Sequence, residues 1–66
     1  MYITIYKHPH QTAFIGVPHG AAVPDAYQDW RYFKSIHLLP GQPRIGMLEP
    51  ADTILGRIEE VGWSVM

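Results

Sequence analysis

The stretch from Glu49 to Met66, EPADTILGRIEEVGWSVM, predicts a helix and organises the rest of the chain. Pro50 suits the first helical position, because its missing N–H would be unpaired there in any case. Asp52 places negative charge in the first turn, where the helix dipole favours it. The apolar residues that follow recur at the spacing of one helical stripe, and they are Ile54, Leu55, Ile58 and Val61.

Gly62 predicts the end of this helix, since glycine readily adopts the left-handed conformation that closes a helical turn. Residues 63–66 are too apolar to hang free in water, and we expect them to add a short strand to a sheet. A helix of about three turns is not stable alone in water. The apolar stripe therefore has to cover a sheet that the rest of the chain supplies.

Three segments predict the strands of that sheet, at 2–6, 12–17 and 30–38. In the first, Ile3 and Ile5 face one side by alternation. The first two segments are close enough in sequence to pair as an antiparallel hairpin. The third alternates less regularly, because Tyr32 and Phe33 are both large, and this is typical of a central strand or of a strand with a bulge.

The connections between these segments carry proline and glycine. Residues 18–28 form the longest irregular stretch before the third strand, with one helical turn possible at 25–28. Residues 40–43 predict a turn-rich loop. In the link that follows, at 44–48, we expect Ile45, Met47 and Leu48 to be tucked against the core.

The order of strand, strand, strand, helix and strand predicts one α+β domain over residues 1–66. We expect a small, mainly antiparallel sheet of three to four strands with the C-terminal helix packed on one face, in an order that the sequence does not define. The predicted core consists of Ile3, Ile5, Ile15, Val17, Phe33, Ile54, Leu55, Ile58 and Val61. A domain of this size has marginal stability, so each core residue matters.

Composition narrows the classes of function. The formal net charge is −1, and the five Lys and Arg are scattered, which disfavours nucleic-acid binding through phosphates. Cysteine is absent, so no disulfide or thiolate metal site is available. The chain has neither an apolar run long enough to span a membrane nor the pattern of a signal peptide. We therefore expect a cytoplasmic protein that has no membrane association.

Several short combinations in this chain resemble a family of short bacterial proteins catalogued only as a domain of unknown function. The combinations are IYKHP at 5–9, VPHG at 17–20, VP at 23–24, DW at 29–30 and GW at 62–63. They span most of the chain, and the segment from 32 to 40 departs from the family by being more aromatic and apolar. The resemblance implies no activity, cofactor or functional residue.

The histidines offer one candidate site. His8 and His10 flank Pro9, and imidazoles two residues apart on an extended segment can point the same way toward zinc, copper or nickel. A closed zinc site needs four ligands, and no recognised spacing supplies the others. Metal binding at His8 and His10 is thus an alternative, and the opposing interpretation is a solvated turn. No cofactor is predicted.

An aromatic sheet face is the other candidate. Tyr2 and Tyr6 share a face of the first strand, and we expect Phe14 and Tyr32 to contribute to the same binding surface. Trp30 is a further candidate binding residue, either as an interface anchor or as an indole that closes one end of the core. Such a surface suits a protein partner or a second copy of the chain. Bases can also stack on it, which makes a weak single-stranded nucleic-acid binder a further alternative. The opposing interpretation is a monomer with scattered exposed aromatics.

The sequence contains no catalytic motif. Candidate acid–base groups such as His19, Asp25 and Asp29 lie in or beside one loop, but no nucleophile elbow, phosphate-binding glycine loop or carboxylate pair accompanies them. We predict a non-enzymatic protein-binding or regulatory module that works through its open sheet face and the loop at 18–28, including by self-association of the sheet face. No small-molecule ligand can be inferred.

Overall fold

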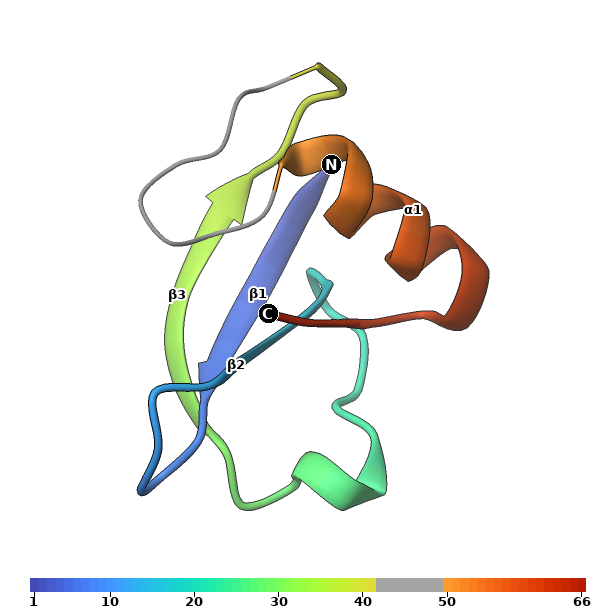
Figure 1. Cartoon of the computed structure of the whole chain (residues 1–66). Helices are drawn as coiled ribbons and strands as arrows, with labels where there is room; N and C mark the ends of the chain where they lie inside the picture. Colours follow the sequence, from blue (N-terminus) through green and yellow to red (C-terminus); the bar gives the residue numbers. More distant parts are fainter. Residues whose placement is uncertain (42–49) are drawn as a thin grey trace.

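The computed structural model describes residues 1–41 and 50–66 (Figure 1). The predicted buried residues Ile45, Met47 and Leu48 lie outside these ranges. The elements in chain order are β1 (Tyr2–Lys7), β2 (Phe14–Pro18), the 3-10 turn η1 (Asp25–Tyr27), β3 (Arg31–His37), α1 (Ala51–Val61) and β4 (Ser64–Val65).

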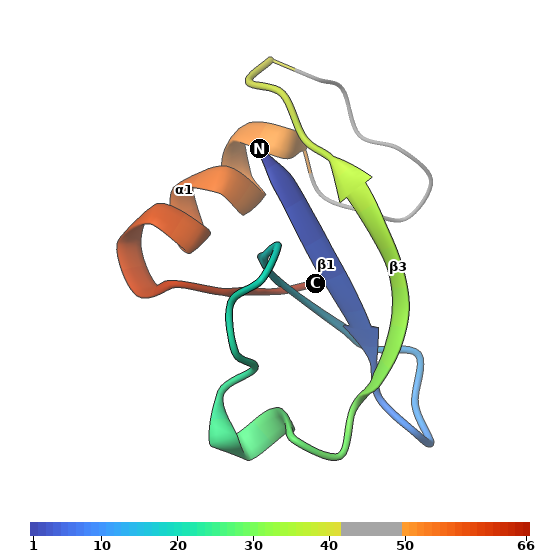
Figure 2. The same cartoon turned by 180° about the vertical axis from the view of Figure 1, so that it is seen from behind.

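The four strands form one sheet in the order β3-β1-β2-β4, and every pairing is antiparallel. The helix near the C-terminus lies to one side of the sheet, as the two opposite views show (Figures 1 and 2). The ladder between β1 and β3 continues one residue further, because the Leu38 N–H donates to the Met1 carbonyl at 2.8 Å. The predicted α+β class, with a terminal strand after the helix, is confirmed.

Helix α1 begins at Ala51, one residue later than predicted. Pro50 precedes it in an extended conformation, with φ −55° and ψ 145°, and its carbonyl accepts the first helical hydrogen bonds. Gly62 ends the helix in the left-handed conformation at φ 94°, and its N–H donates to the Ile58 carbonyl at 2.8 Å. The predicted glycine stop is confirmed, since this φ is accessible to glycine without strain. No helix in the described part of the chain has the length and apolar character needed to cross a membrane.

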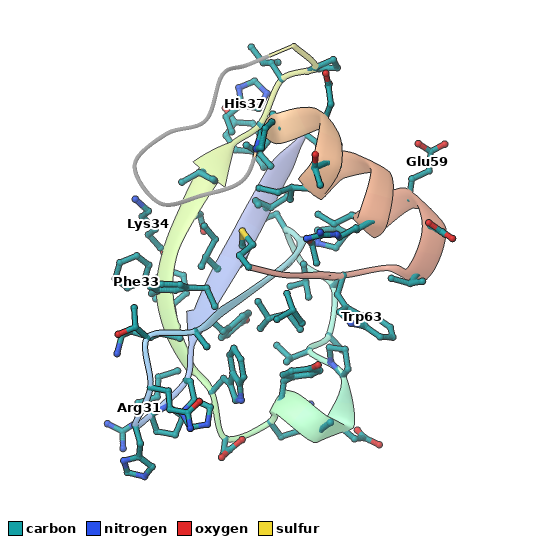
Figure 3. The ribbon with its side chains drawn as sticks, viewed as in Figure 1. Arg31, Phe33, Lys34, His37, Glu59 and Trp63 are labelled. Atoms are coloured by element: carbon teal, nitrogen blue, oxygen red, sulfur yellow. The ribbon has the colours of Figure 1, made fainter. Side chains whose placement is uncertain are left out.

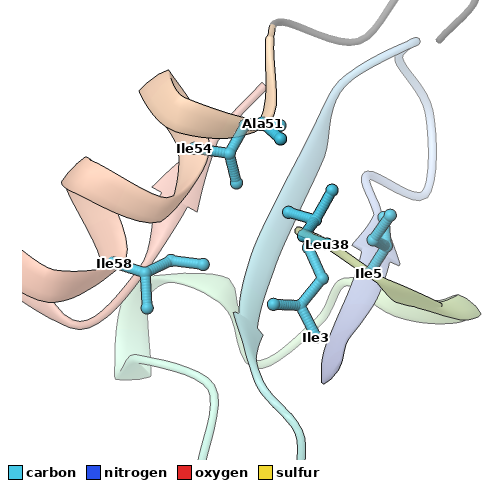
Figure 4. Close-up of a cluster of buried hydrophobic side chains, with 6 residues drawn as sticks. All are labelled: Ile3, Ile5, Leu38, Ala51, Ile54 and Ile58. Carbon is cyan, nitrogen blue, oxygen red and sulfur yellow. The ribbon is translucent and has the colours of Figure 1, made fainter. Parts of the chain in front are cut away.

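The main core lies between α1 and one face of the sheet (Figure 4). Its buried members are Ile3, Ile5, Leu38, Ala51, Ile54 and Ile58. The prediction was wrong for Phe33 and Val61, whose side chains are 48% and 51% exposed. Val61 lies in the last turn of α1, beyond the part of the helix that faces the sheet, and Leu55 is only partly buried at the margin of the core.

The opposite face of the sheet is covered over part of its width. Ile15 and Val17 are buried as predicted, but they pair with Tyr6 and Thr4 and so lie on the face opposite Ile3 and Ile5. Thr4 is also buried there, at 7% exposure. This face is therefore open to solvent mainly along β3 and at Tyr2.

A bulge sets the register between β1 and β3. Ile5 pairs with Lys34, but the next residue, Tyr6, pairs with Tyr32, so Phe33 is the additional residue. Of the two interpretations of this irregular segment, the bulge is confirmed. The strand itself is at the edge of the sheet. The extra residue shifts the alternation of β3 by one position. Odd-numbered residues before Phe33 and even-numbered residues after it therefore lie on the core face.

Candidate functional site

Two cross-strand ring pairs form the exposed half-face between β1 and β3. Tyr2 stacks on His37 with ring centroids 4.3 Å apart and planes 12° from parallel. Tyr6 meets Tyr32 edge to face, with centroids 6.3 Å apart. We name this set, Tyr2, Tyr6, Tyr32 and His37, the tyrosine face. The two pairs follow directly from the register, since Tyr2 lies opposite His37 and Tyr6 opposite Tyr32.

The rings of the tyrosine face are open to solvent and held in place. Tyr2 is 62% exposed and Tyr32 is 64% exposed. The Tyr32 hydroxyl lies 3.5 Å from the Ser35 Oγ on the same strand. Ser35 is opposite Thr4, so every residue of this half-face is uncharged apart from the titratable His37. The half-face is thus an amphipathic aromatic surface without a fixed charge.

Phe14 does not belong to the tyrosine face, contrary to the prediction. It pairs with Lys7, which places it on the face of Ile5, and it packs against the core beneath α1. Its ring is 5.1 Å from that of Phe33. The prediction had the correct alternation within β2 but not the register between the strands, and register decides which face a strand residue shares with its neighbour.

Trp30 contacts one ring of η1 and one ring of the turn that follows β1. Its ring centroid is 5.0 Å from that of Tyr27 in η1 and 5.2 Å from that of His8, with edge-to-face geometry at both contacts. The side chain is half-buried. Trp30 therefore joins η1 to the end of β1, which is the structural use of an indole that the sequence left open.

His8 caps the turn that follows β1. Its Nδ1 accepts the backbone N–H of His10 at 3.0 Å and that of Gln11 at 3.1 Å. A nitrogen that accepts these bonds carries no proton, so the neutral ring is protonated on Nε2. A metal ion bound at Nε2 would require the proton to move to Nδ1, and a metal ion at Nδ1 would replace both bonds. Either way, metal binding at His8 breaks the turn.

His10 is exposed, and its ring centroid is 6.2 Å from that of His8. Within residues 1–41 and 50–66, no group of three or more His, Cys, Asp or Glu side chains is placed to hold a metal ion. Two histidines, one of them engaged in a turn, make a poor metal site. No observation favours the metal-binding alternative over the turn.

The cations near the tyrosines by sequence are on the other face of the sheet. Lys7 lies opposite Arg31, and Lys34 lies opposite Ile5, so all three share the face of the core rather than the tyrosine face. A base-stacking surface needs cations beside its rings to bind phosphates. The tyrosine face lacks them, and this separation weighs against the nucleic-acid alternative.

The sequence prediction missed His37 as a member of the tyrosine face. The signal was available in part, since the third strand was expected to reach residue 38. The contact with Tyr2 depends on a bulge four residues away, whose position only the paired structure defines.

In comparisons with known proteins, no family model, curated protein or solved structure matches this chain.

Proposed function

We propose that this chain is a non-catalytic protein-binding module whose contact surface is the tyrosine face. The observation that supports the proposal is the pair of exposed cross-strand contacts, Tyr2 on His37 and Tyr6 on Tyr32, on one uncharged half-face. Tyrosine is enriched in the cores of protein interfaces, where charged residues are depleted.

Order in the free protein favours binding through these rings. Binding costs side-chain entropy for each side chain that it immobilises, and a tyrosine has few rotatable bonds to lose. Tyr2 and Tyr32 are more than half exposed, yet each already contacts a ring on the neighbouring strand. Much of that entropic cost is therefore met on folding rather than on binding.

A second copy of the chain suits this surface. Two-fold dimers place the same patch of each subunit against its counterpart, so a patch that carries charge of one sign repels its copy. The tyrosine face has no Lys, Arg, Asp or Glu. Dimerisation would also add buried area to a domain whose own core is small. A different protein with a complementary apolar patch is the other partner of this class.

Solution mass tests the proposal. We expect light scattering behind a sizing column to report two chains per particle at high concentration and a falling mass on dilution. The variant Tyr2→Glu with Tyr32→Glu places four carboxylates at a two-fold interface and should remain a monomer. The control Val61→Glu changes an apolar residue on α1 that is also about half exposed, and this variant should still dimerise.

The variants also distinguish the two kinds of partner. Circular dichroism should show the same fold for the wild type and both variants, because the substituted side chains are about half exposed or more. A wild-type monomer at every concentration would remove the second copy as partner. If the Tyr2/Tyr32 variant and the Val61 control dissociate to monomers to the same extent, the tyrosine face is excluded as the interface.

A further inference from the structure

The outer edge of β3 is the feature that carries a further inference. β3 is at the end of the strand order β3-β1-β2-β4 and is one of the longest strands, with seven residues. No strand in the described ranges pairs with its outer side. An edge strand presents N–H and C=O groups that an added strand can pair with, and extended peptides bind proteins in this way.

The side chains along this edge carry positive charge. Arg31 and Lys34 share a face because the bulge at Phe33 inserts one residue between them. Figure 3 shows Arg31, Phe33 and Lys34 following β3 on the opposite side of the molecule from Glu59. Neither cation makes a side-chain hydrogen bond or ion pair with the described residues.

A third cation adds to this surface. Lys7 lies directly opposite Arg31 on the neighbouring strand. Like charges at directly opposed positions destabilise a sheet, and no described carboxylate separates or neutralises this pair. An anionic group bound beside Arg31 would relieve the repulsion. The arrangement is thus unfavourable in the free protein and complementary to an acidic ligand.

Phe33 provides an apolar contact between the two cations of β3. Its ring packs on Phe14 at 5.1 Å between centroids, and the Lys34 Nζ lies 5.5 Å from its centroid. The side chain is still 48% exposed. A ligand that lies along β3 would therefore meet a cation, an aromatic ring and a second cation in order.

The charge pattern argues against a second copy at this edge. None of the four described strands contains Asp or Glu, so another copy has no acidic strand to offer. Two β3 strands paired antiparallel about their centre would place Lys34 against Lys34. Charged residues on an edge are a known protection against such pairing.

We propose that the outer edge of β3 binds an extended acidic peptide of another protein by strand addition. The peptide would carry acidic residues two positions apart, because alternate residues of a strand face the same side and would lie beside Arg31 and Lys34. The inference rests on the proposed function as a protein-binding module, but it uses the edge of the sheet instead of the tyrosine face.

The test uses a fluorescein-labelled peptide that alternates valine and glutamate over the length of β3. We expect its anisotropy to rise on titration with the wild-type protein, and Lys34→Glu to weaken binding by roughly tenfold or more. The matched peptide with lysine in place of glutamate should show the reverse preference, binding Lys34→Glu better than the wild type. If the wild type and Lys34→Glu show the same preference between the two peptides, the specificity for an acidic ligand is overturned.

Backbone pairing is tested with two further peptides, each N-methylated at one of the two alternating sets of residues. Each pattern blocks a different edge of the peptide, so one should abolish binding and the other should preserve it. Equal behaviour of the two patterns would overturn strand addition. Binding should also slow amide exchange at alternate residues of β3, those whose N–H points away from β1.

Two outcomes separate this inference from the proposed function and from a nucleic-acid site. Tyr2→Glu should leave peptide affinity unchanged, because Tyr2 is on β1 and on the other face. The edge inference therefore fails alone if the tyrosine face mediates association but no acidic peptide binds. Tighter binding of a labelled oligothymidylate than of the acidic peptide would overturn the peptide as ligand.

Discussion

Met66 packs across Gly16, and its side chain would be in tight contact with a Cβ at that position. A Cβ built on Gly16 would lie 3.0 Å from the Met66 Cε and 3.2 Å from the Ile3 Cδ1. Just beside this contact, the backbones of Phe14 and Met66 exchange two hydrogen bonds, at 2.8 and 3.3 Å. A side chain at position 16 would therefore have to displace the ends of Met66 and Ile3, and the backbone of Gly16 has no positive φ.

The first prediction concerns this contact. Gly16→Ala should lower the free energy of unfolding by about 1 kcal/mol, because the new methyl group overpacks the site. In a Met66→Ala background the closer of the two contacts is removed and the Ile3 contact remains, so the same change should cost less. A double-mutant cycle from urea denaturation measures the coupling. Strict additivity of the two changes would contradict the packing role of Gly16.

The second prediction compares two residues of the helical stripe. Ile58 is 5% exposed in the core beneath α1, whereas Val61 is 51% exposed. Ile58→Ala should cost about 2–5 kcal/mol, since it removes buried groups and leaves a cavity. Val61→Ala should change stability by less than about 0.5 kcal/mol. Chemical denaturation of both variants checks the difference, and equal losses would show that the last turn of α1 is also part of the core.

The third prediction concerns the turn after β1. His8→Leu removes the acceptor of the His10 and Gln11 N–H groups and should cost about 1 kcal/mol. His8→Asn should retain most of the stability, because the amide oxygen of asparagine accepts backbone N–H groups in turns of this kind. Thermal denaturation at neutral pH compares the two. If both variants lose the same stability, the hydrogen bonds accepted by the His8 Nδ1 do not account for the contribution of His8 to stability.

The fourth prediction follows from the same two bonds. Zinc or nickel should leave the NMR resonances of His8 and His10 in place and should not raise the melting temperature. A metal that bound the folded chain would stabilise it by mass action. The control is a protein variant with two histidines at i and i+4 on the exposed face of α1, at Thr53 and Arg57, where the spacing suits a metal ion. A shift in the wild type would contradict the geometry at His8.

The fifth prediction concerns a buried hydroxyl in β4. Ser64 is 1% exposed, and its Oγ has no hydrogen-bond partner among the described residues. A buried hydroxyl without a partner costs about 1–3 kcal/mol, so Ser64→Ala should leave the free energy of unfolding unchanged or raise it by about 1 kcal/mol. The control Ser35→Ala changes an exposed hydroxyl and should be neutral within about 0.5 kcal/mol. A clear loss at Ser64 alone would contradict this account.

Much of the fold could be predicted from local sequence, but less of the candidate site. The helix with its glycine stop and the apolar residues Ile3, Ile5, Ile54 and Ile58 were all predicted, since each follows from periodicity or backbone stereochemistry over a few residues. Leu38 was missed because Phe33 was predicted as the core residue of the third strand, and alternation from Phe33 without a bulge places residue 38 on the other face. The placement of Phe14 on the same face as Tyr2 and Tyr6 was wrong, because it depended on the register between β1 and β2.

The sequence by itself determined the types, order and approximate bounds of the elements, because side-chain spacing and the conformational freedom of Gly62 act within a single segment. The tertiary structure alone decided that β3 lies at the edge, that Tyr2 meets His37, and that Arg31 and Lys34 share a face. The physical reason is the period of two in a strand. One additional residue, Phe33, exchanges the two faces of β3, and only the pairing with β1 shows where it is inserted.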